Sequence, residues 1–265
     1  MDLGLRGQRA LVTAASRGLG RACAAALAAE GARVVIAARQ QETLEQCAAS
    51  LREATGSQVI AIPADLRVAE QIEALVRQTV AELGGLEILV HNTGGPPGGS
   101  FEDCSDAHWQ DAYDLVLLSA VRLVRAALPF LQQHPGEGRI IFLTSSAAKQ
   151  PIPSLVLSNA LRPGVVGLAK TLSRELAPVG ITVNSVCPGR MATERLRQGH
   201  HVQRALATGY TEEEAFQELA REVPLGRLGR PEEVGALVAF LASHQAGYIT
   251  GTAIQIDGGL IQGLW

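Results

Sequence analysis

Short apolar segments alternate with helix-like segments along almost the whole chain. Runs of aliphatic and β-branched residues predict seven strands, at residues 10–12, 33–38, 58–62, 86–90, 138–144, 181–186 and 253–256. Between them, apolar residues recur three and four positions apart, which predicts amphipathic helices. These helices cover 18–30, 42–54, 68–83, 106–133, 155–177 and 232–242, and residues 190–223 are polar with shorter helical pieces.

The alternation indicates a single α/β domain over residues 1–265. Strands separated by helices form a parallel sheet that is covered on both faces, with right-handed crossovers. No linker interrupts the rhythm, and we expect residues 190–223 to act as a lid over the substrate. Pro129 is expected to kink or end its helix, and Pro163 to kink its helix or delay its start.

Turns rich in glycine follow three predicted strands, at 13–20, 92–99 and 188–189. In the first turn, a strand leads directly into a helix, so free N–H groups and the positive end of the helix dipole point at one spot. Gly18 and Gly20 lack a Cβ and allow close approach of a phosphate. Ligands of doubly wound sheets bind at this edge. The pattern therefore predicts a nucleotide site there.

Composition narrows the class of partner. The net charge of −3 and the pI of about 6.1 give no indication of a nucleic acid or a membrane as partner. The four cysteines are dispersed without a C-x-x-C pair, so no metal site or disulfide framework is expected. With no signal-peptide pattern and no apolar run near the ~18 residues of a membrane span, we expect a cytoplasmic protein.

Five segments, in this order, carry a family resemblance: Thr13–Gly20, Ala64–Leu66, His91–Gly94, Ile181–Gly189 and Pro224–Gly259. Over nearly its whole length the chain resembles the short-chain dehydrogenase/reductase family, and within it the 3-oxoacyl-carrier-protein reductases. The resemblance implies a Rossmann-type, doubly wound fold and hydride transfer between a nicotinamide and a carbonyl or alcohol. Ala14 stands where the family has the first glycine of its phosphate turn, a departure expected to tighten the approach of the phosphates.

The resemblance and the phosphate turn together imply a set of cofactor-binding residues: Thr13, Ser16, Arg17, Gly18, Leu19, Gly20, Arg39, Asp65, Leu66, Asn92, Gly94, Pro188, Gly189 and Thr193. The second strand ends in Ala37-Ala38-Arg39, without the carboxylate that holds the ribose hydroxyls in NAD enzymes. Arg17 and Arg39 would instead pair with a 2′-phosphate. We therefore favour NADP(H) over NAD(H) as the cofactor.

The pattern breaks at the catalytic residues. The family's chemistry uses a serine, a tyrosine and a lysine, with an asparagine behind them, and Ser145 matches the serine. The tyrosine position falls on Leu155, the lysine position on Asn159 and the asparagine position on Val116. The interval from Ser145 to Leu155 is also shorter than usual. No tyrosine lies between residues 114 and 209, so the family's proton donor is missing.

Two interpretations follow. In the first interpretation, the protein is a divergent reductase with another proton donor. The candidates for this donor are Lys149, Tyr210 if the lid folds down, and a water molecule held by Ser145. We take Ser145 and Lys149 as the catalytic candidates, Lys149 being one of only two lysines. Alternatively, the protein binds NADP(H) without reducing carbonyls and acts as a sensor or a supporting subunit. His91, at the end of a strand, is expected to be structural.

The substrate pocket is expected between residues 95–100, 145–155 and 190–215. Its apolar members, Pro96, Pro97, Ile152 and Leu155, favour an apolar carbonyl compound, while a hydroxylated substrate and an acyl thioester stay open. The helices at 106–133 and 155–177 resemble those that pair subunits in the family. Small residues at Gly164, Gly167 and Ala169 would allow close helix approach, so we expect a homotetramer or homodimer.

Overall fold

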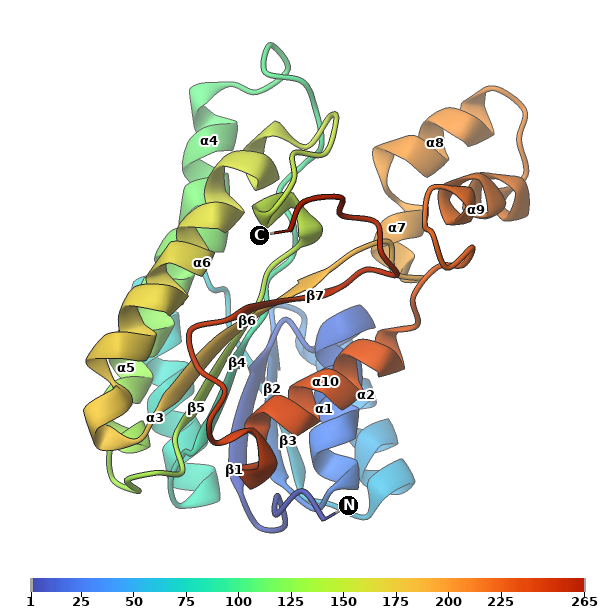
Figure 1. Ribbon diagram of the computed structural model, residues 1–265. Helices are drawn as coiled ribbons and strands as arrows, with labels where there is room; N and C mark the ends of the chain where they lie inside the picture. Colours follow the sequence, from blue (N-terminus) through green and yellow to red (C-terminus); the bar gives the residue numbers. More distant parts are fainter. Residues whose placement is uncertain (1, 265) are drawn as a thin grey trace.

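The apolar runs form a seven-stranded parallel sheet in the computed structural model, which describes residues 2–264 (Figure 1). The strands are β1 (Arg9–Thr13), β2 (Arg33–Ala38), β3 (Val59–Pro63), β4 (Ile88–His91), β5 (Arg139–Leu143), β6 (Thr182–Pro188) and β7 (Ala253–Ile256). Their order is β3-β2-β1-β4-β5-β6-β7, and every pair is parallel. The order reverses between β1 and β4, which confirms the doubly wound, Rossmann-type prediction.

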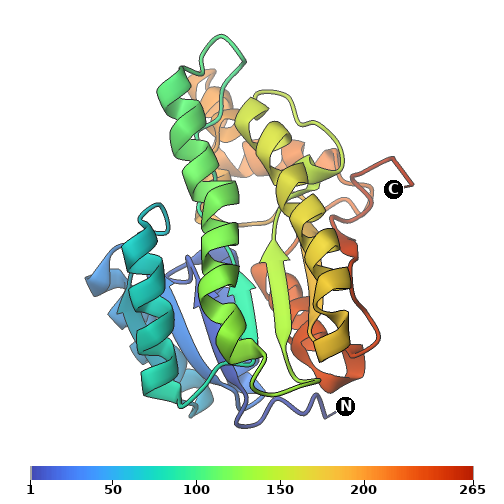
Figure 2. The same cartoon turned by 90° about the vertical axis from the view of Figure 1, so that its left-hand side faces the viewer.

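Helices cover both faces of the sheet, because successive strand residues point to opposite sides. Val12 and Ile36 pack under α1 (Gly18–Ala29), α2 (Gln41–Thr55) and α10 (Pro231–Ala242). Leu11 and Val35 pack on the other face, under α3 (Ala69–Leu83), α5 (Ser119–Leu131) and α6 (Val156–Glu175). Figures 1 and 2 show the two helical layers on either side of the sheet.

The helix α10 crosses close against α1. A side chain at Gly235 would run into the backbone of Ala22, so this glycine lets the two helices approach. Pro231 occupies the first turn of α10, where its missing N–H costs nothing, as predicted.

The segment predicted as one helix at 106–133 is interrupted. It consists of α4 (Asp106–Tyr113), a π-helical turn η1 (Asp114–Leu118) and α5. Pro129 lies inside α5, which continues two residues beyond it and ends at Leu131. Pro163 lies inside α6, which begins at Val156. Both prolines fall in helices whose apolar faces are buried in the core, and this packing outweighs one lost hydrogen bond.

Three short helices follow β6: α7 (Glu194–Arg197), α8 (His200–Ala207) and α9 (Glu212–Arg221). α8 and α9 share a small core of Val202, Ala215 and Leu219. Thr211 caps α9 by accepting from the Glu214 N–H at 3.2 Å, and the Glu214 carboxylate accepts from the Thr211 N–H at 2.7 Å. The acidic run therefore forms the first turn of a helix, as expected.

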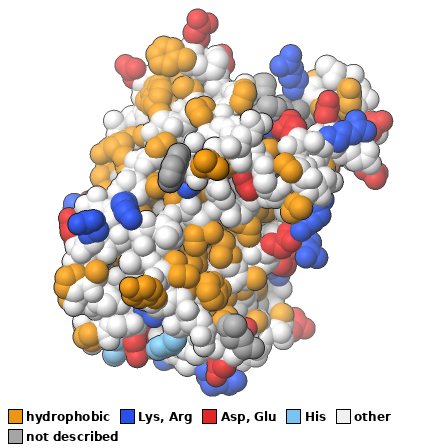
Figure 3. Space-filling view, viewed as in Figure 1, with side chains coloured by type: hydrophobic (Ala, Val, Ile, Leu, Met, Phe, Trp, Pro, Cys, Tyr) orange, Lys and Arg blue, Asp and Glu red, His pale blue; other side chains and the backbone are white. Residues whose placement is uncertain are grey.

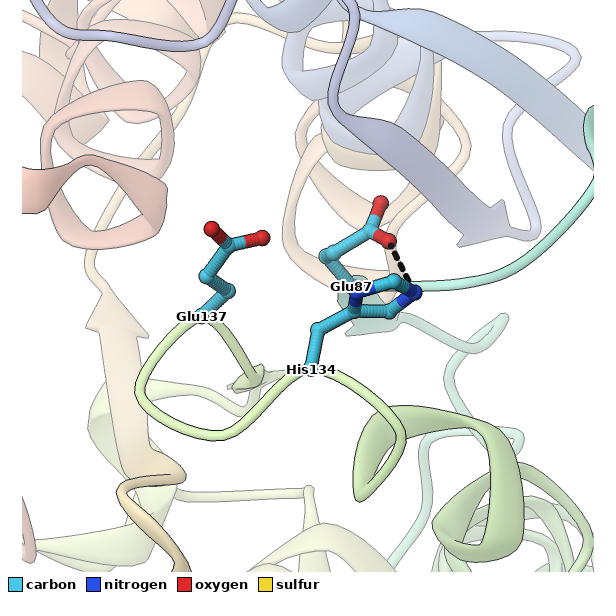
Figure 4. A group of neighbouring side chains, drawn as sticks. All are labelled: Glu87, His134 and Glu137. Atoms are coloured by element: carbon cyan, nitrogen blue, oxygen red, sulfur yellow. Dashed lines mark ion pairs between the residues drawn. The ribbon is translucent and has the colours of Figure 1, made fainter.

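A buried ion pair lies at the opposite end of the sheet, where β1, β4 and β5 begin. Glu87 is 2% exposed and pairs with Arg9, whose Nη2 lies 2.8 Å from the Nε2 of His134. Figure 4 shows Glu87 and His134 facing each other, with Glu137 on the same loop as His134. The hydrogen bond that Arg9 donates to Glu87 raises the pKa of Arg9, so the carboxylate already has its counter-cation. We assign this group a structural role.

No helix among residues 2–264 has the length and apolarity needed to cross a lipid bilayer.

Candidate active site

The turn between β1 and α1 is built for close approach of a ligand. Gly18 has a φ of +57°, a conformation that glycine adopts freely. At Gly20 a Cβ would overlap the Ala14 carbonyl and lie 2.8 Å from Nδ2 of Asn92. Ala14 itself has a φ of +46°, where an L-residue pays roughly 1–2 kcal/mol. The alanine thus takes the backbone shape of the glycine it replaces, at the expense of local strain.

Hydrogen bonds clamp this turn to the end of β4. The Thr13 hydroxyl donates to the Asn92 carbonyl at 2.7 Å and accepts from the Asn92 N–H at 2.9 Å. Nδ2 of Asn92 donates to the Ala14 carbonyl at 3.2 Å. The clamp lies where the strand order reverses, so it fixes the crevice in which such sheets bind nucleotides.

The end of β2 offers a cation and no carboxylate. Arg39 is exposed there, close enough to Asp65 to help lower the pKa of that carboxyl, although the hydrogen bond from Arg67 is the larger cause. Arg17 is exposed at the start of α1 and pairs with Glu194 at 2.8 Å. Leu66 is buried in the core beside Asp65. Ser16 and Gly94 are accessible on the same side of the sheet.

A cavity of about 570 Å³ opens at the carboxyl ends of β4, β5 and β6. The apolar residues predicted for the pocket all line it: Pro96, Pro97, Ile152 and Leu155. Five of the proposed cofactor residues line it as well: Leu19, Asn92, Pro188, Gly189 and Thr193. The nucleotide turn and the pocket therefore form one continuous site. Within the predicted span, the described residues 202–215 contribute nothing to the lining, whereas Glu222, Leu260 and Ile261 do.

Of the proposed catalytic residues, Ser145 lines the cavity and the others do not. The Ser145 hydroxyl accepts from the Ala147 N–H at 3.1 Å, which fixes the start of the 3-10 turn at Ser146–Ala148. Lys149 follows this turn and is half-buried outside the cavity lining. Tyr210 is 47% exposed between α8 and α9, also away from the lining. Lys149 and Tyr210 therefore stay predictions as proton donors, and of the three residues only Ser145 lines the cavity.

The family positions assigned from the sequence also point elsewhere. Asn159 exchanges two hydrogen bonds with the backbone of Ile152, accepting at 3.0 Å and donating at 2.8 Å. It secures the preceding loop and does not line the cavity. Val116 is buried in the π-helical turn.

Sequence reasoning missed two residues of α6 that do line the cavity, Ser158 and Arg162. They have the four-residue spacing of the family's tyrosine and lysine, three residues further along than Leu155 and Asn159. They present a hydroxyl and a cation, 7% and 8% exposed respectively. The unusually short interval between Ser145 and Leu155 could have revealed them. Placing the family's tyrosine position three residues later, on Ser158, lengthens this interval.

Arginines give the cavity a positive character. Nη1 of Arg162 donates to the Thr144 carbonyl at 2.9 Å, and burial lowers the pKa of this guanidinium to about 10. Nη2 of Arg195 donates to the Pro96 carbonyl at 2.9 Å. Arg190 is neutralised by Glu222 at 2.6 Å. An electron-rich oxygen is the kind of ligand that this surface favours.

Comparisons with known proteins identify the family. A family model described as Enoyl-(Acyl carrier protein) reductase matches residues 13–261. A 3-oxoacyl-[acyl-carrier-protein] reductase of Synechocystis sp. is 35% identical over 258 residues, which cover 97% of this chain and 98% of the relative.

Solved structures give the same result. The L-sorbose reductase of Gluconobacter frateurii, complexed with NADPH and L-sorbose, superimposes with a TM-score of 0.95 at 32% identity, over all of both chains. An NADPH-bound short chain oxidoreductase of Pseudomonas aeruginosa PAO1, described as containing an atypical catalytic center, has a TM-score of 0.89 at 32% identity. That match covers 97% of this chain and 98% of the other.

These relatives are oxidoreductases, which supports the enzyme interpretation, and none of them supports a sensor or supporting subunit. The predicted fold and resemblance are confirmed over the full length that the comparisons cover. The chain belongs to the short-chain dehydrogenase/reductase family of oxidoreductases.

Proposed function

We propose that this chain is an NADP(H)-dependent reductase that adds hydride to a carbonyl carbon in the 570 Å³ cavity, or removes it from the corresponding alcohol. One observation carries this proposal: the phosphate turn of α1 and Ser145 open on the same cavity. The two solved relatives described above were both determined with NADPH, which supports the choice of cofactor.

The residues present fit a dinucleotide. The first N–H groups of α1 face the phosphate turn, and the lack of space for a Cβ at Gly20 keeps that turn tight. Arg17 and Arg39 would hold the 2′-phosphate, and Asp65 and Leu66 the adenine. Pro188, Gly189 and Thr193 would hold the nicotinamide end. When bound, the cofactor supplies the hydride, and the chain holds the substrate in line with it and excludes water.

The lining favours an apolar carbonyl compound with one polar end. Proline, isoleucine and leucine side chains line the cavity together with Ser145 and the buried Arg162. A 3-oxoacyl thioester, which the Synechocystis relative's name implies, and a sugar ketone, which the sorbose reductase binds, are the two alternatives to test. We further propose that residues 190–223 act as the lid, since α7 already borders the cavity.

Nucleotide titration followed by a carbonyl panel on the same sample tests the proposal. Binding is read from NADPH and NADH fluorescence. The panel contains cyclohexanone, L-sorbose and the N-acetylcysteamine thioester of acetoacetate. We expect NADPH to bind at least tenfold more tightly than NADH, and one class of probe to be reduced. Binding of neither nucleotide would overturn the proposal.

We also propose a homodimer or homotetramer, with two exposed faces as interfaces. Figure 2 shows α5 and α6 side by side on one face of the molecule. The sequence predicts three small residues of α6 at this interface. Gly167 has open space above it, but Ala169 is buried in the core and Gly164 packs on Leu117 of its own chain. Ala169 is therefore unavailable to a partner, a correction to the sequence interpretation.

The second face lies over β7 and α10, where Figure 3 shows apolar side chains gathered. β7 is an edge strand and is only half-buried. The unpaired N–H and C=O groups of an edge strand favour a partner that covers them. Tyr248, beside it, is fully exposed. Light scattering on the purified protein tests this proposal, and a monomer at micromolar concentration would overturn it.

A further inference from the structure

Arg162 is a buried cation without a counter-anion. Its side chain is held by Nη1, which donates to the carbonyls of Thr144 at 2.9 Å and Leu143 at 3.5 Å. Among residues 2–264, no carboxylate pairs with it. A buried charge left unpaired is costly, so a chain that keeps one favours a ligand with negative charge. The anchoring carbonyl belongs to the residue directly before Ser145, which fixes the guanidinium relative to the serine.

The groups that face Arg162 do not cancel its charge. Arg195, from the segment after β6, is a second cation and lowers the pKa of Arg162 further. His91, at the end of β4, is neutral because burial and Arg162 itself lower its pKa to about 3. The Cys187 thiol on β6 stays protonated, since burial raises its pKa. The cavity wall at Arg162 therefore has a positive potential, which favours binding of an electron-rich substrate oxygen.

Ser158 lies one helical turn before Arg162 and lines the same cavity. In the described part of the chain, no hydrogen bond engages its hydroxyl, although the residue is 7% exposed. A hydroxyl that borders the cavity and has no hydrogen bond within the protein is available to a ligand in the cavity. Ser158 and Arg162 on α6, together with Ser145 just after β5, thus contribute two hydroxyls and one guanidinium to the same cavity.

We propose that Arg162 is the catalytic acid of this enzyme, with Ser158 as the hydroxyl that relays its proton, in place of a tyrosine and a lysine. This rests on the proposed carbonyl reduction. As hydride and its electron pair reach the carbonyl carbon, the C=O π pair moves onto the oxygen. The oxygen takes the Ser158 proton, and Ser158, once its hydroxyl has turned toward Arg162, takes one N–H proton of Arg162. Water then reprotonates the neutral guanidine, so each turnover consumes one proton and oxidises one NADPH to NADP⁺.

The proton affinities permit this transfer. A tyrosine phenol has a pKa of ~10 when free. Burial brings the pKa of the Arg162 guanidinium to about 10, into the range of a phenol. The alkoxide formed by reduction is a much stronger base than a guanidine, so the transfer runs downhill. Before the transfer, the same positive charge polarises the carbonyl, which is the larger part of such catalysis.

The rival donors lie in the wrong place. Lys149 and Tyr210 are both outside the cavity lining, whereas Ser158 and Arg162 are part of it. A lid movement large enough to bring Tyr210 inward would have to carry α8 and α9 with it, because the tyrosine lies between them.

Substitutions on α6 test the assignment. Arg162→Gln is expected to lower kcat at least 100-fold on the probe that the panel identifies, with the Kd for NADPH within threefold of wild type. Ser158→Ala is expected to lower kcat about tenfold. Lys170→Gln is the matched control, because it removes an exposed cation from the same helix, outside the cavity, and we expect it to leave kcat unchanged. An Arg162→Gln enzyme with wild-type kcat would overturn the proposal.

Two further readouts separate a catalytic from a structural role. Guanidinium chloride at 20–50 mM (on the order of the concentrations used for such rescue, below those that unfold proteins) should restore part of the activity of Arg162→Ala, whereas NaCl should not. Benzoate, whose carboxylate mimics an anionic oxygen, should bind the NADP⁺ complex at least tenfold more weakly in Arg162→Gln than in Lys170→Gln, by calorimetry.

The calorimetric test also distinguishes failure of this inference from failure of the proposed function. Benzoate binding that depends on Arg162, in a protein that reduces none of the probes, would retain the anion site and refute the reductase assignment. Reduction of a probe with no dependence on Arg162, or no binding of benzoate by the wild type, would refute the role of Arg162.

Discussion

His91 is held neutral by its surroundings. It is fully enclosed, its Nε2 lies 2.9 Å from the Ser119 hydroxyl, and its ring meets Phe142 edge-on at 5.7 Å. The structural role expected for it is therefore consistent with its contacts, although the partner is α5 and not a neighbouring loop. Burial lowers its pKa to about 3, far below the ordinary value of 6.5.

The shift of His91 predicts a loss of stability in acid. Between pH 6.5 and about 3 the unfolded chain binds a proton at this site and the folded chain does not. The free energy of unfolding contributed by His91 is thus complete above pH 6.5 and falls by at most ~1.4 kcal/mol per unit below it. Urea unfolding of wild type and His91→Gln at pH 7.5, 6.0 and 5.0 measures the difference. Parallel pH dependences of the two proteins would contradict the prediction.

Arg39 should decide between the two nicotinamide cofactors. It is exposed at the end of β2, beside Asp65 but not hydrogen-bonded to it, and so is available to a 2′-phosphate. Arg39→Ala is expected to weaken NADPH binding about tenfold, the worth of one charged hydrogen bond, and to leave NADH binding unchanged. Fluorescence titration of both nucleotides measures this. Arg6→Ala, which removes an arginine at the other end of the sheet, is the control.

At the scale of single residues, the sequence predicts the geometry of the nucleotide turn better than the part of the cavity lining that α6 provides. Thr13, Gly20 and Asn92 are recognisable because backbone geometry demands their types, through a clamp and a missing Cβ. Ser158 and Arg162 are not, because the residue types that the family uses are absent from α6 and nothing local fixes the register. Only their common burial beside one cavity identifies them.

The phosphate turn depends on contacts between elements. Gly20→Ala would place a methyl group against the Ala14 carbonyl and Nδ2 of Asn92, so the turn must open or the clamp to β4 must break. We expect NADPH binding to fall at least 100-fold and the Tm to drop. Ala14→Gly is the matched change, because it relieves a φ of +46° while the clamp stays, and it should bind NADPH as the wild type does. Equal binding by the Gly20→Ala variant would contradict this role of the turn.

The periodicity of apolar residues predicts the boundaries of the strands and of most helices. It does not predict the interruption of the helix at 106–131. The widened turn at Asp114–Leu118 keeps the 3–4 residue spacing of apolar side chains almost intact, so the sequence still resembles one helix. The two prolines suggest interruptions that do not occur. Propensity argues for breaks at Pro129 and Pro163, and the burial of α5 and α6 against the sheet overrides it.

The ion pair at the amino ends of the strands joins distant parts of the molecule. Glu87 accepts from the Arg9 backbone N–H at 2.8 Å and from Arg9 Nε at 2.9 Å, so it links β1 to β4. Glu87→Gln removes the counter-charge of Arg9 inside the protein and is expected to cost about 3–5 kcal/mol of unfolding free energy. Glu73→Gln, which breaks an exposed pair with Arg77 at 3.6 Å, should cost less than ~1 kcal/mol. Urea unfolding of both variants checks this, and equal losses would refute the structural role.

The crossing of α10 over α1 joins the two ends of the chain. This contact affects how the chain folds while the ribosome synthesises it. The first cofactor helix leaves the ribosome more than 200 residues before the helix that covers it, residues 18–29 against 231–242. Until then its apolar surface is exposed, available to chaperones and to aggregation. A nascent chain stopped by a late nonsense codon would therefore carry a nearly complete nucleotide turn on an unfinished core and be a target for proteolysis.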